Sequence, residues 1–584
     1  MWRSLVAHTL GVRVVAGSNP ATPIPVFGGN KQENGKHVVR NLPADRMTAI
    51  AAAILAIAIA VGAGMRAIAL DRIPLGFQQD EACNGYDAYS LITTAHDHHG
   101  NFLPLAIQGF NDYRMPLFDY SLAPLIGTFG LKPWVVRMGA AIWGIADLIA
   151  IALIATELID PIAAAAAVIL LVLSPWHLAM SRFGVETISA STTISWAIAF
   201  FLLALKRHDG RYLAACALLF GISLYSYSIT KPVTPLVLAW LAFLYRRDLR
   251  PMARWAAGAA AIFVVVAIPQ LWMIATHGDA MQAHFRQISA ISGPDGLATF
   301  AINWLTHFTP GFLFGDNGWP IVHAGNLIPF LPGEALLAIA GLIGLLAQAT
   351  RRAAMLLIGW IAVTAIPGST IRPAPEPQAL HDFLMVAPFA LLAALGASIL
   401  IRTPFQDLNS APIRIASTAI AAAAMVFAMI EGISSARYYF TKFPDEHAAL
   451  FQYGLDELIH TAQRLAPPDY PIILPLSFNE PYIYALFFNA YPPERFYSNE
   501  IAAERGLFGQ VFAFDRYGFT ANPWKAYNQL PHGVFIFPKA VVRLKNPMQA
   551  FSAAADTGYS FPDPPAPPAA TLRFGREVYS IVVK

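Results

Sequence analysis

Apolar runs of about 20 residues, the length needed to cross a bilayer, recur along this chain from Thr48 to about Gly432 and then stop. Only 13% of the 584 residues are charged, whereas soluble domains have about 25%. This pattern is typical of a membrane protein with many spans. We expect about eleven transmembrane helices. They lie near residues 48–70, 134–155, 161–176, 187–205, 211–229, 232–245, 254–275, 335–350, 353–368, 380–400 and 412–432.

Basic residues in the short loops indicate the orientation, because Lys and Arg favour the cytoplasmic side. They occur in alternate loops: Lys206, Arg207 and Arg211, then Arg246, Arg247, Arg250 and Arg254, then Arg351 and Arg352, then Arg402 and Arg414. We therefore expect the N-terminus inside and the segments 71–133, 277–334 and 433–584 outside. So much chain on the periplasmic face of an inner membrane is typical of an enzyme that works there.

The predicted fold is a polytopic all-α membrane protein with periplasmic juxtamembrane helices and a small C-terminal α/β periplasmic domain. We assign residues 47–432 to the transmembrane domain and residues 433–584 to the periplasmic domain. The second domain is predicted to be α/β because short apolar runs typical of strands alternate with a helical run. The strand-like runs are 470–476, 532–537 and 577–583, and the helical run is 480–491.

The first 46 residues differ from the rest, because they are polar and lack the apolar core of a signal peptide. Within them, VVAGSNPATPI (14–24) resembles a translated tRNA gene. We expect residues 1–46 to be a non-native or disordered extension, with Met47 near the true start. A genuine cytoplasmic tail is the alternative.

Charge and cysteine usage exclude two further classes. The net charge of +3 comes without a dense Lys/Arg face, so no nucleic-acid partner is expected. The two cysteines, Cys83 and Cys216, are too few for a disulfide framework. We expect no structural disulfide.

An acidic pair follows the first expected span closely. The loop GFQQDEACNGYDAYSL (76–91) places Asp80 and Glu81 side by side near the lipid headgroups. A carboxylate there can accept the proton of a hydroxyl group during group transfer. The alternatives are a solvated loop or a helix N-terminus, where the helix dipole favours acidic residues.

A second polar group precedes the next span. Asp112, Tyr113 and Arg114 lie in GFNDYRMPLFDYSLAPLIGTFGLKPWVVR (109–137), which is predicted to be a hairpin on the membrane surface. The order of span, Asp-Glu loop, Tyr-basic-x-Pro-Leu and second span resembles the protein O-mannosyltransferase and aminoarabinose-transferase family of C-type glycosyltransferases. SPWHLAMSRFGVE (174–186) adds to the resemblance, which extends in layout over about residues 48–440.

The resemblance implies an inverting hexosyl- or pentosyltransferase. Its donor would be a polyprenyl-phosphate sugar and its acceptor a lipid, a glycan or a protein. In the family, the first-loop aspartate is the proposed base, which corresponds to Asp80 with Glu81 as its neighbour. The family's Lys-Pro-Pro-Leu is Arg114-Met115-Pro116-Leu117 here, which keeps a cation for the donor phosphate. Asp112 and Tyr113 are assigned to substrate binding with Arg114.

Other polar residues at the outer ends of the spans are further candidates for substrate binding. They are His177, Arg182, Glu186, Lys231, Arg372 and His381. His381 stands where related enzymes place an arginine that faces the lipid phosphate. The alternatives are an interfacial anchor for His177 and an i,i+4 ion pair between Arg182 and Glu186.

Histidines and acids in two loops have little support as metal ligands. They are His96, His98 and His99 in the first loop, and His307, Asp316 and His323 in the long loop. Their intervals are not those of a recognised site. We assign no metal ligand and leave a divalent metal open as a cofactor.

Two rival functions remain for this sequence. A flippase or transporter of lipid-linked sugars needs ionisable residues in mid-membrane, where Asp147 is the main exception to otherwise apolar spans. A non-catalytic subunit of surface-polysaccharide assembly is the other. The enzyme interpretation requires a polyprenyl-phosphate donor, an acceptor and membrane lipid as partners.

Overall fold

The computed structural model describes residues 44–110, 113–281, 285–286, 289–315, 328–371, 379–402, 411–498, 502–503, 511–542, 558–574 and 577–584. Residues Met47–Lys584 form one compact unit, separate from Met1–Arg46. The expectation for residues 1–46 therefore falls almost wholly outside the described residues.

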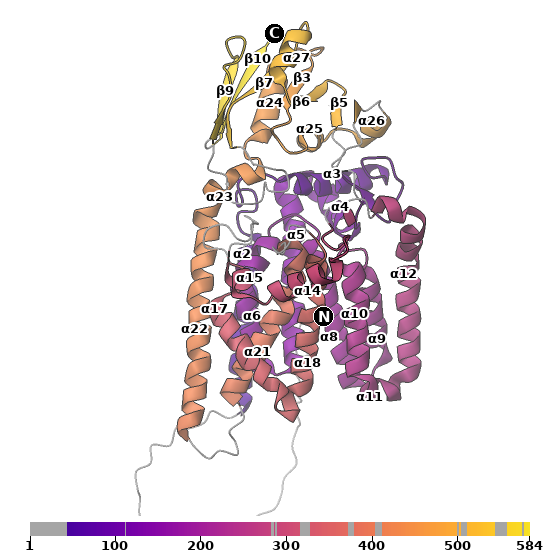
Figure 1. The fold of residues 1–584 in the computed structure, drawn as a ribbon, viewed down its shortest axis with the longest axis vertical. Helices are drawn as coiled ribbons and strands as arrows, with labels where there is room; N and C mark the ends of the chain where they lie inside the picture. The colour runs from indigo at the N-terminus through magenta and orange to yellow at the C-terminus, as the bar shows by residue number, and fades with distance from the viewer. Residues whose placement is uncertain are drawn as a thin grey trace, which may run out of the picture. The chain divides into compact units, whose positions relative to one another are not determined.

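Apolar helices form most of this unit. Seven are long and apolar enough to cross a membrane. They belong to α2 (Ala44–Ala67), α5 (Pro133–Leu158), α8 (Thr187–Arg207), α12 (Ala253–Met281), α18 (Gln348–Thr364), α21 (Val386–Arg402) and α22 (Ala411–Thr441). Four shorter apolar helices are α6 (Pro161–Leu173), α9 (Gly210–Ser223), α10 (Thr230–Leu244) and α17 (Pro332–Leu342). Each predicted span coincides with one of these helices, and the chain is a multi-pass membrane protein (Figure 1).

The count of about eleven spans stays a prediction, because four of these helices are shorter than the roughly 20 residues that a bilayer normally requires. Proline and glycine set several of their limits. Asp160 caps the start of α6 by accepting from the backbone of Ile162 and Ala163, and Pro161 occupies the first helical position.

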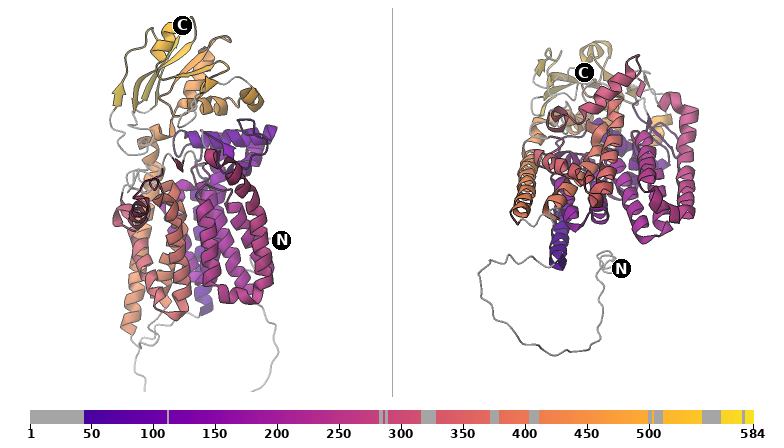
Figure 2. Two further views of the ribbon diagram at one scale, coloured as in Figure 1. Left: turned by 45° about the vertical axis from the view of Figure 1, so that its right-hand side comes forward. Right: turned by 60° about the horizontal axis from the view of Figure 1, so that its bottom comes forward.

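Short helices lie across one end of the apolar helices. The helices α3 (Gln79–Thr94) and α4 (Leu117–Phe129) run roughly at right angles to the spans, as Figures 1 and 2 show from different directions. Between them, β1 (Ile107–Gln108) and β2 (Tyr113–Arg114) pair antiparallel, with Ile107 opposite Arg114. The short helices at this end agree with the predicted juxtamembrane helices. The predicted membrane-surface hairpin over 109–137 is mostly the helix α4 and the start of α5, because the only strands among the described residues here are the two short ones that pair 107–108 with 113–114.

The C-terminal segment, which follows α22, contains a mixed sheet of eight strands in the order β4-β5-β6-β3-β7-β10-β9, with β8 paired to β7. The predicted strand runs fall on β3 (Ile472–Pro475), β7 (Val534–Val542) and β10 (Glu577–Val583), and the helical run on α25 (Pro481–Phe488). The other strands are β4 (Ala502–Ala503), β5 (Val511–Phe514), β6 (Tyr517–Thr520), β8 (Gly558–Ser560) and β9 (Ala570–Phe574). All four residues of β3 are buried, as expected for a central strand paired in parallel with both β6 and β7.

The C-terminal segment packs directly on α3. The hydroxyl of Tyr86 donates to the backbone oxygen of Tyr491 at 2.7 Å. A Cβ at Gly85 would lie 2.6 Å from the ring of Phe487, so only glycine permits this approach of α25. The acidic loop therefore lies between the apolar helices and the C-terminal segment.

Candidate functional site

The acidic pair forms the first turn of α3. Gln78 is the residue before the helix, and its Oε1 accepts from the backbone N–H of Asp80 at 2.6 Å. In return, the carboxylate of Glu81 accepts from the backbone N–H of Gln78 at 3.1 Å. This reciprocal capping box satisfies backbone donors that a helix start leaves unpaired. The helix-start interpretation of the pair therefore holds, and it does not exclude a chemical role for Asp80.

Glu81 is fully buried and paired. Arg137 of α5 donates from Nε to Oε1 at 2.8 Å and from Nη2 to Oε2 at 3.0 Å. The backbone N–H of Gly184 adds a bond to Oε1 at 3.0 Å. With Gln78, four donors engage this carboxylate, so Glu81 joins α3 to α5 and to the loop before α8.

Asp80 has a different environment, because its side chain is only half-buried. Gln78 Nε2 donates to Asp80 Oδ2 at 3.1 Å and helps to hold the carboxylate in place. Of the two neighbouring acids, Asp80 is thus the one that a bound molecule can reach. This distinction could not be made from the sequence, which gives the two residues equal positions.

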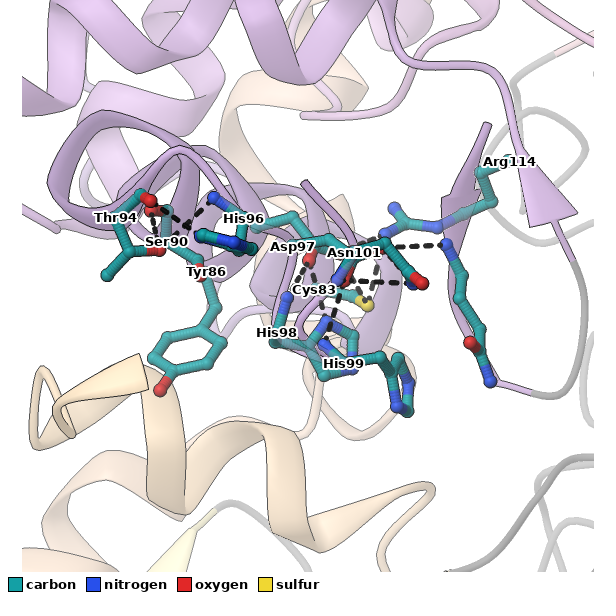
Figure 3. Close-up of polar contacts among 12 residues, drawn as sticks. Cys83, Tyr86, Ser90, Thr94, His96, Asp97, His98, His99, Asn101 and Arg114 are labelled. Carbon is teal, nitrogen blue, oxygen red and sulfur yellow. Dashed lines mark hydrogen bonds and ion pairs between the residues drawn. The ribbon is translucent and has the colours of Figure 1, made fainter. Parts of the chain in front are cut away.

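A buried cluster continues along the same face of α3, seven residues beyond Asp80. Asp87 Oδ2 accepts from Arg114 Nη2 at 2.6 Å, and Asp87 Oδ1 lies 2.6 Å from His98 Nδ1. Arg114 Nη2 also lies 3.2 Å from Cys83 Sγ. Cys83, His98 and Arg114 come together here from α3, the loop after it and β2 (Figure 3). Burial alone would raise the pKa of Asp87, but His98 and Arg114 hold it below its usual range.

Arg114 keeps donors available for an anion. It is 8% exposed, and neither Nε nor Nη1 has a hydrogen-bond partner among the described residues. Glu186 at the start of α8 contributes negative charge around the guanidinium, and the carboxyl group of Asp119 of α4 also lies close to it. Burial raises the pKa of Asp119 well above its usual range. The predicted residues Arg114 and Glu186 are therefore neighbours.

Ligand atoms of Cys83, Asp87 and His98 lie within 4.8 Å of one another. A thiolate, a carboxylate and an imidazole are a donor set that suits zinc. The guanidinium of Arg114, however, contacts both Cys83 Sγ and Asp87 Oδ2, and supplies the positive charge that a metal would bring. The cluster as it stands fits an arginine rather than a metal. Of the long-loop residues that had little support as ligands, Asp316 and His323 lie outside the described residues, and His307 Nε2 lies 2.9 Å from Asp382 Oδ1.

His177 lies in a separate buried network between α2, α5 and α7 (Pro175–Met180). Its Nδ1 is 2.7 Å from Arg66 Nη2, and its Nε2 is 3.3 Å from Asp147 Oδ2. Asp147 also accepts from the hydroxyl of Ser191 at 2.8 Å. Asp147, the ionisable residue noted in mid-membrane, is therefore part of a network that joins α2, α5, α7 and α8.

Arg182 contacts the end of α2. It donates to the backbone oxygens of Met65 at 2.8 Å, Arg66 at 3.1 Å and Ile73 at 3.0 Å. The last carbonyls of a helix have no partner within the helix, so a buried arginine there completes its C-terminus. The predicted ion pair between Arg182 and Glu186 is not among the contacts of the described residues, because Arg182 turns to α2.

The remaining predicted residues lie at two places. Tyr113 precedes Arg114 in β2 and is half-buried. His381 stacks on Tyr227 with ring centroids 6.0 Å apart, and Tyr227 precedes Lys231 by four residues, in the connection before α10. Asp112 and Arg372 lie outside the described residues.

Sequence reasoning missed Asp87, Arg137 and Glu480. Asp87 follows Asp80 by two helical turns, so helical periodicity alone could have placed both on one face. Arg137 was not singled out as a site residue, because it is only the last residue of the stretch 109–137. Glu480 is far away in the sequence, and nothing in its neighbourhood indicated contact with the first loop.

Comparisons with known proteins bear on the family and the fold of this chain. Residues 114–272 match the family model described as dolichyl-phosphate-mannose-protein mannosyltransferase. A search of curated protein sequences gives no significant match. Among solved structures, ArnT from Cupriavidus metallidurans bound to undecaprenyl phosphate is 11% identical, with 92% of this chain and 98% of that chain covered and a TM-score of 0.50. The oligosaccharyltransferase AglB from Archaeoglobus fulgidus is 15% identical, with 75% and 63% covered and a TM-score of 0.48. The predicted resemblance to C-type membrane glycosyltransferases is confirmed, and the likeness to ArnT shows a shared fold.

Proposed function

We propose that this chain is an inverting glycosyltransferase that moves a sugar from a polyprenyl-phosphate-linked donor to a periplasmic acceptor on a lipid, a glycan or a protein. The observation that carries the proposal is the contrast between Asp80 and Glu81. Glu81 is buried and engaged by four donors, whereas Asp80 is half-buried in the same helical turn. A base must reach the proton that it accepts, and Asp80 meets this requirement.

In the proposed reaction, the acceptor hydroxyl gives its proton to the carboxylate of Asp80. The acceptor oxygen then bonds to the anomeric carbon from the face opposite the phosphate. The bond between that carbon and the phosphate oxygen breaks, and polyprenyl phosphate leaves with the electron pair. A single displacement of this kind inverts the configuration at the anomeric carbon.

Arg114 is proposed to stabilise the leaving phosphate. Its Nη2 is held by Asp87, which orients the guanidinium, while Nε and Nη1 have no partner among the described residues. Charge-assisted bonds from a preorganised arginine to phosphate are strong. Lys231 and His381, with Tyr227 beside them, are proposed as a second contact for the donor.

Two comparisons support this donor class. The matched family model is named for a dolichyl-phosphate-mannose donor, and the ArnT structure of similar fold contains undecaprenyl phosphate. Both molecules are polyprenyl phosphates. We extend the class, and not the particular sugar or acceptor, to this chain.

A transfer assay with the full chain in lipid vesicles tests the proposal. Membranes supplied with a polyprenyl-phosphate sugar should yield free polyprenyl phosphate and a glycosylated acceptor. Movement of the intact lipid-linked sugar across the vesicle without cleavage would instead support a flippase. If neither occurs, a non-catalytic subunit is the better interpretation. Mass spectrometry of a deletion strain should reveal the accumulated donor and thereby its sugar.

A further inference from the structure

Glu480 is an unusual residue of the C-terminal segment. It precedes α25 with a φ of +49° and a ψ of +58°, a left-handed conformation that is uncommon for a residue with a side chain. It is only 5% exposed, and its Oε2 has no hydrogen-bond partner among the described residues. A buried carboxyl oxygen without a partner is unfavourable, so this arrangement requires an explanation.

The surrounding contacts hold Glu480 toward the start of α3. Gln452 accepts from the backbone N–H of Asn479 at 3.0 Å and donates to the hydroxyl of Tyr484 at 2.8 Å. The same amide lies 3.4 Å from Oε1 of Gln79, the residue before Asp80. One glutamine therefore ties both sides of Glu480 to the first turn of α3. Burial and then the charge of Asp80 raise the pKa of Glu480 to about 7.

We propose that Glu480 is a second carboxyl group of the Asp80 site, supplied by the C-terminal segment, and that its protonation controls the binding of the anionic donor. This inference rests on the proposed function for the identity of the donor. Glu480 acts here as a positioning residue, because it sets the charge that the donor phosphate meets.

Electrostatics gives the direction of the effect. While Glu480 is neutral, Asp80 is the negative charge at this part of the site. When Glu480 ionises, two neighbouring carboxylates repel an approaching phosphate. The site is thus most receptive to the donor below neutral pH and less so above it.

The other groups that face Glu480 do not produce this effect. Glu81 on α3 is paired with Arg137. Burial raises the pKa values of Tyr482 and Tyr484, on the helix that Glu480 begins, well above their usual range, so both phenols stay neutral. Tyr482 is also close enough to Asp87 and Arg114 for their charges to act on it. His98 lies beyond Tyr482, where it is paired with Asp87.

The test measures the binding of polyprenyl phosphate to the full chain in nanodiscs between pH 6 and pH 8. Glu480→Gln should bind like the wild type at pH 6 and about tenfold more tightly at pH 8, as expected for one unit charge removed at several ångströms. Glu480→Asp should keep the wild-type pH dependence. Glu494→Gln, an exposed glutamate of the same segment, is the matched control and should also keep it. Titration of the phosphate group of polyprenyl phosphate itself affects all variants equally, so it does not change the comparison between them.

The outcomes separate this inference from the proposed function. An identical pH dependence in the wild type and in folded Glu480→Gln overturns the inference and leaves the transferase proposal intact. Failure of every protein to bind polyprenyl phosphate overturns both. If Glu480→Gln does not fold, Asp80→Asn decides, because loss of the Asp80 charge should move the midpoint of the pH dependence to lower pH. An unchanged midpoint would then refute the coupling of the two carboxyl groups.

Discussion

Arg137 donates hydrogen bonds to both carboxylate oxygens of Glu81, at 2.8 and 3.0 Å, and neither side chain is exposed. The same guanidinium donates to the backbone oxygens of Leu70, Pro74 and Gly76, in the loop between α2 and α3. One buried ion pair therefore fixes the path of the chain that leads to Asp80. The position of the proposed base depends on it.

Glu81→Gln should destabilise the protein, because it leaves the Arg137 cation buried without its counter-charge. Removing one partner of a buried ion pair costs on the order of 3 kcal/mol. Thermal unfolding in detergent should show a clearly lower Tm than for the wild type, whereas the exposed-site control Glu494→Gln should not. An unchanged Tm for Glu81→Gln would mean that the pair does not organise the loop.

Asp80→Asn should abolish most transfer without affecting folding. Asparagine keeps the size of the side chain but cannot accept the proton, so the rate should fall by about 10²–10⁴-fold, as is typical for the loss of a general base. The measurement is single-turnover transfer in membranes, with Tm as the folding control. A stable Asp80→Asn variant with undiminished transfer would remove the base from the mechanism.

Arg114→Ala should weaken the use of the donor more than Arg114→Lys. Binding of the donor phosphate is expected to depend more on the positive charge, which lysine keeps, than on the geometry of the guanidinium. The KM for the polyprenyl-phosphate sugar should rise in the order wild type, lysine, alanine. Arg114→Ala should also lower the Tm, since Asp87 loses its contact at 2.6 Å. Wild-type transfer by both variants would show that Arg114 does not contact the phosphate.

Stability should decrease as the pH rises toward 8. The pKa of Glu480 is raised from 4.5 to about 7 in the folded protein, so its contribution is complete below 4.5 and is lost as the pH passes through about 7. Each pKa unit corresponds to about 1.4 kcal/mol, which limits the effect to about 3 kcal/mol. The difference in Tm between pH 6 and pH 8 should shrink in Glu480→Gln. An equal difference in Tm between pH 6 and pH 8 in the wild type and in Glu480→Gln would contradict the ionisation assigned to Glu480.

Reporter fusions test the orientation that the proposed function requires. Alkaline phosphatase fused after Lys584 should be active, and a fusion at Arg247 should be silent, because the loops rich in Arg are expected in the cytoplasm. The opposite pattern would reverse the orientation and place Asp80 on the cytoplasmic side.

The apolar helices could be predicted from the sequence because the bilayer imposes both length and composition on each one. α5 and α8 begin and end within a few residues of their predicted limits. The strands β3, β7 and β10 were also found, since they are short, continuous apolar runs. The other strands of the sheet, β4, β5, β6, β8 and β9, were not predicted. β4 and β8 have only two and three residues, which give no periodicity.

Individual residues of the site were predicted less well than the fold. Asp80 and Arg114 lie in the part of the chain that resembles the family, and the structure places them beside the same helix face. His177 and Arg182 were assigned to substrate binding as well. In the structure, however, His177 contacts Asp147 and Arg66, and Arg182 contacts the end of α2. Partners such as Arg137 and Glu480 are determined by packing between distant segments, which single-sequence patterns do not contain.

Cys83 has no exposed surface and lies beside both Arg114 and Tyr482, so the C-terminal segment helps to cover it. The other cysteine, Cys216, is buried in α9 among the apolar helices. Burial also raises the pKa of the Cys83 thiol well above its usual range, so a water-soluble alkylating reagent should react with it only when local opening exposes it. The rate of modification at Cys83 therefore measures how often that opening occurs, and the measurement requires no substitution in the protein.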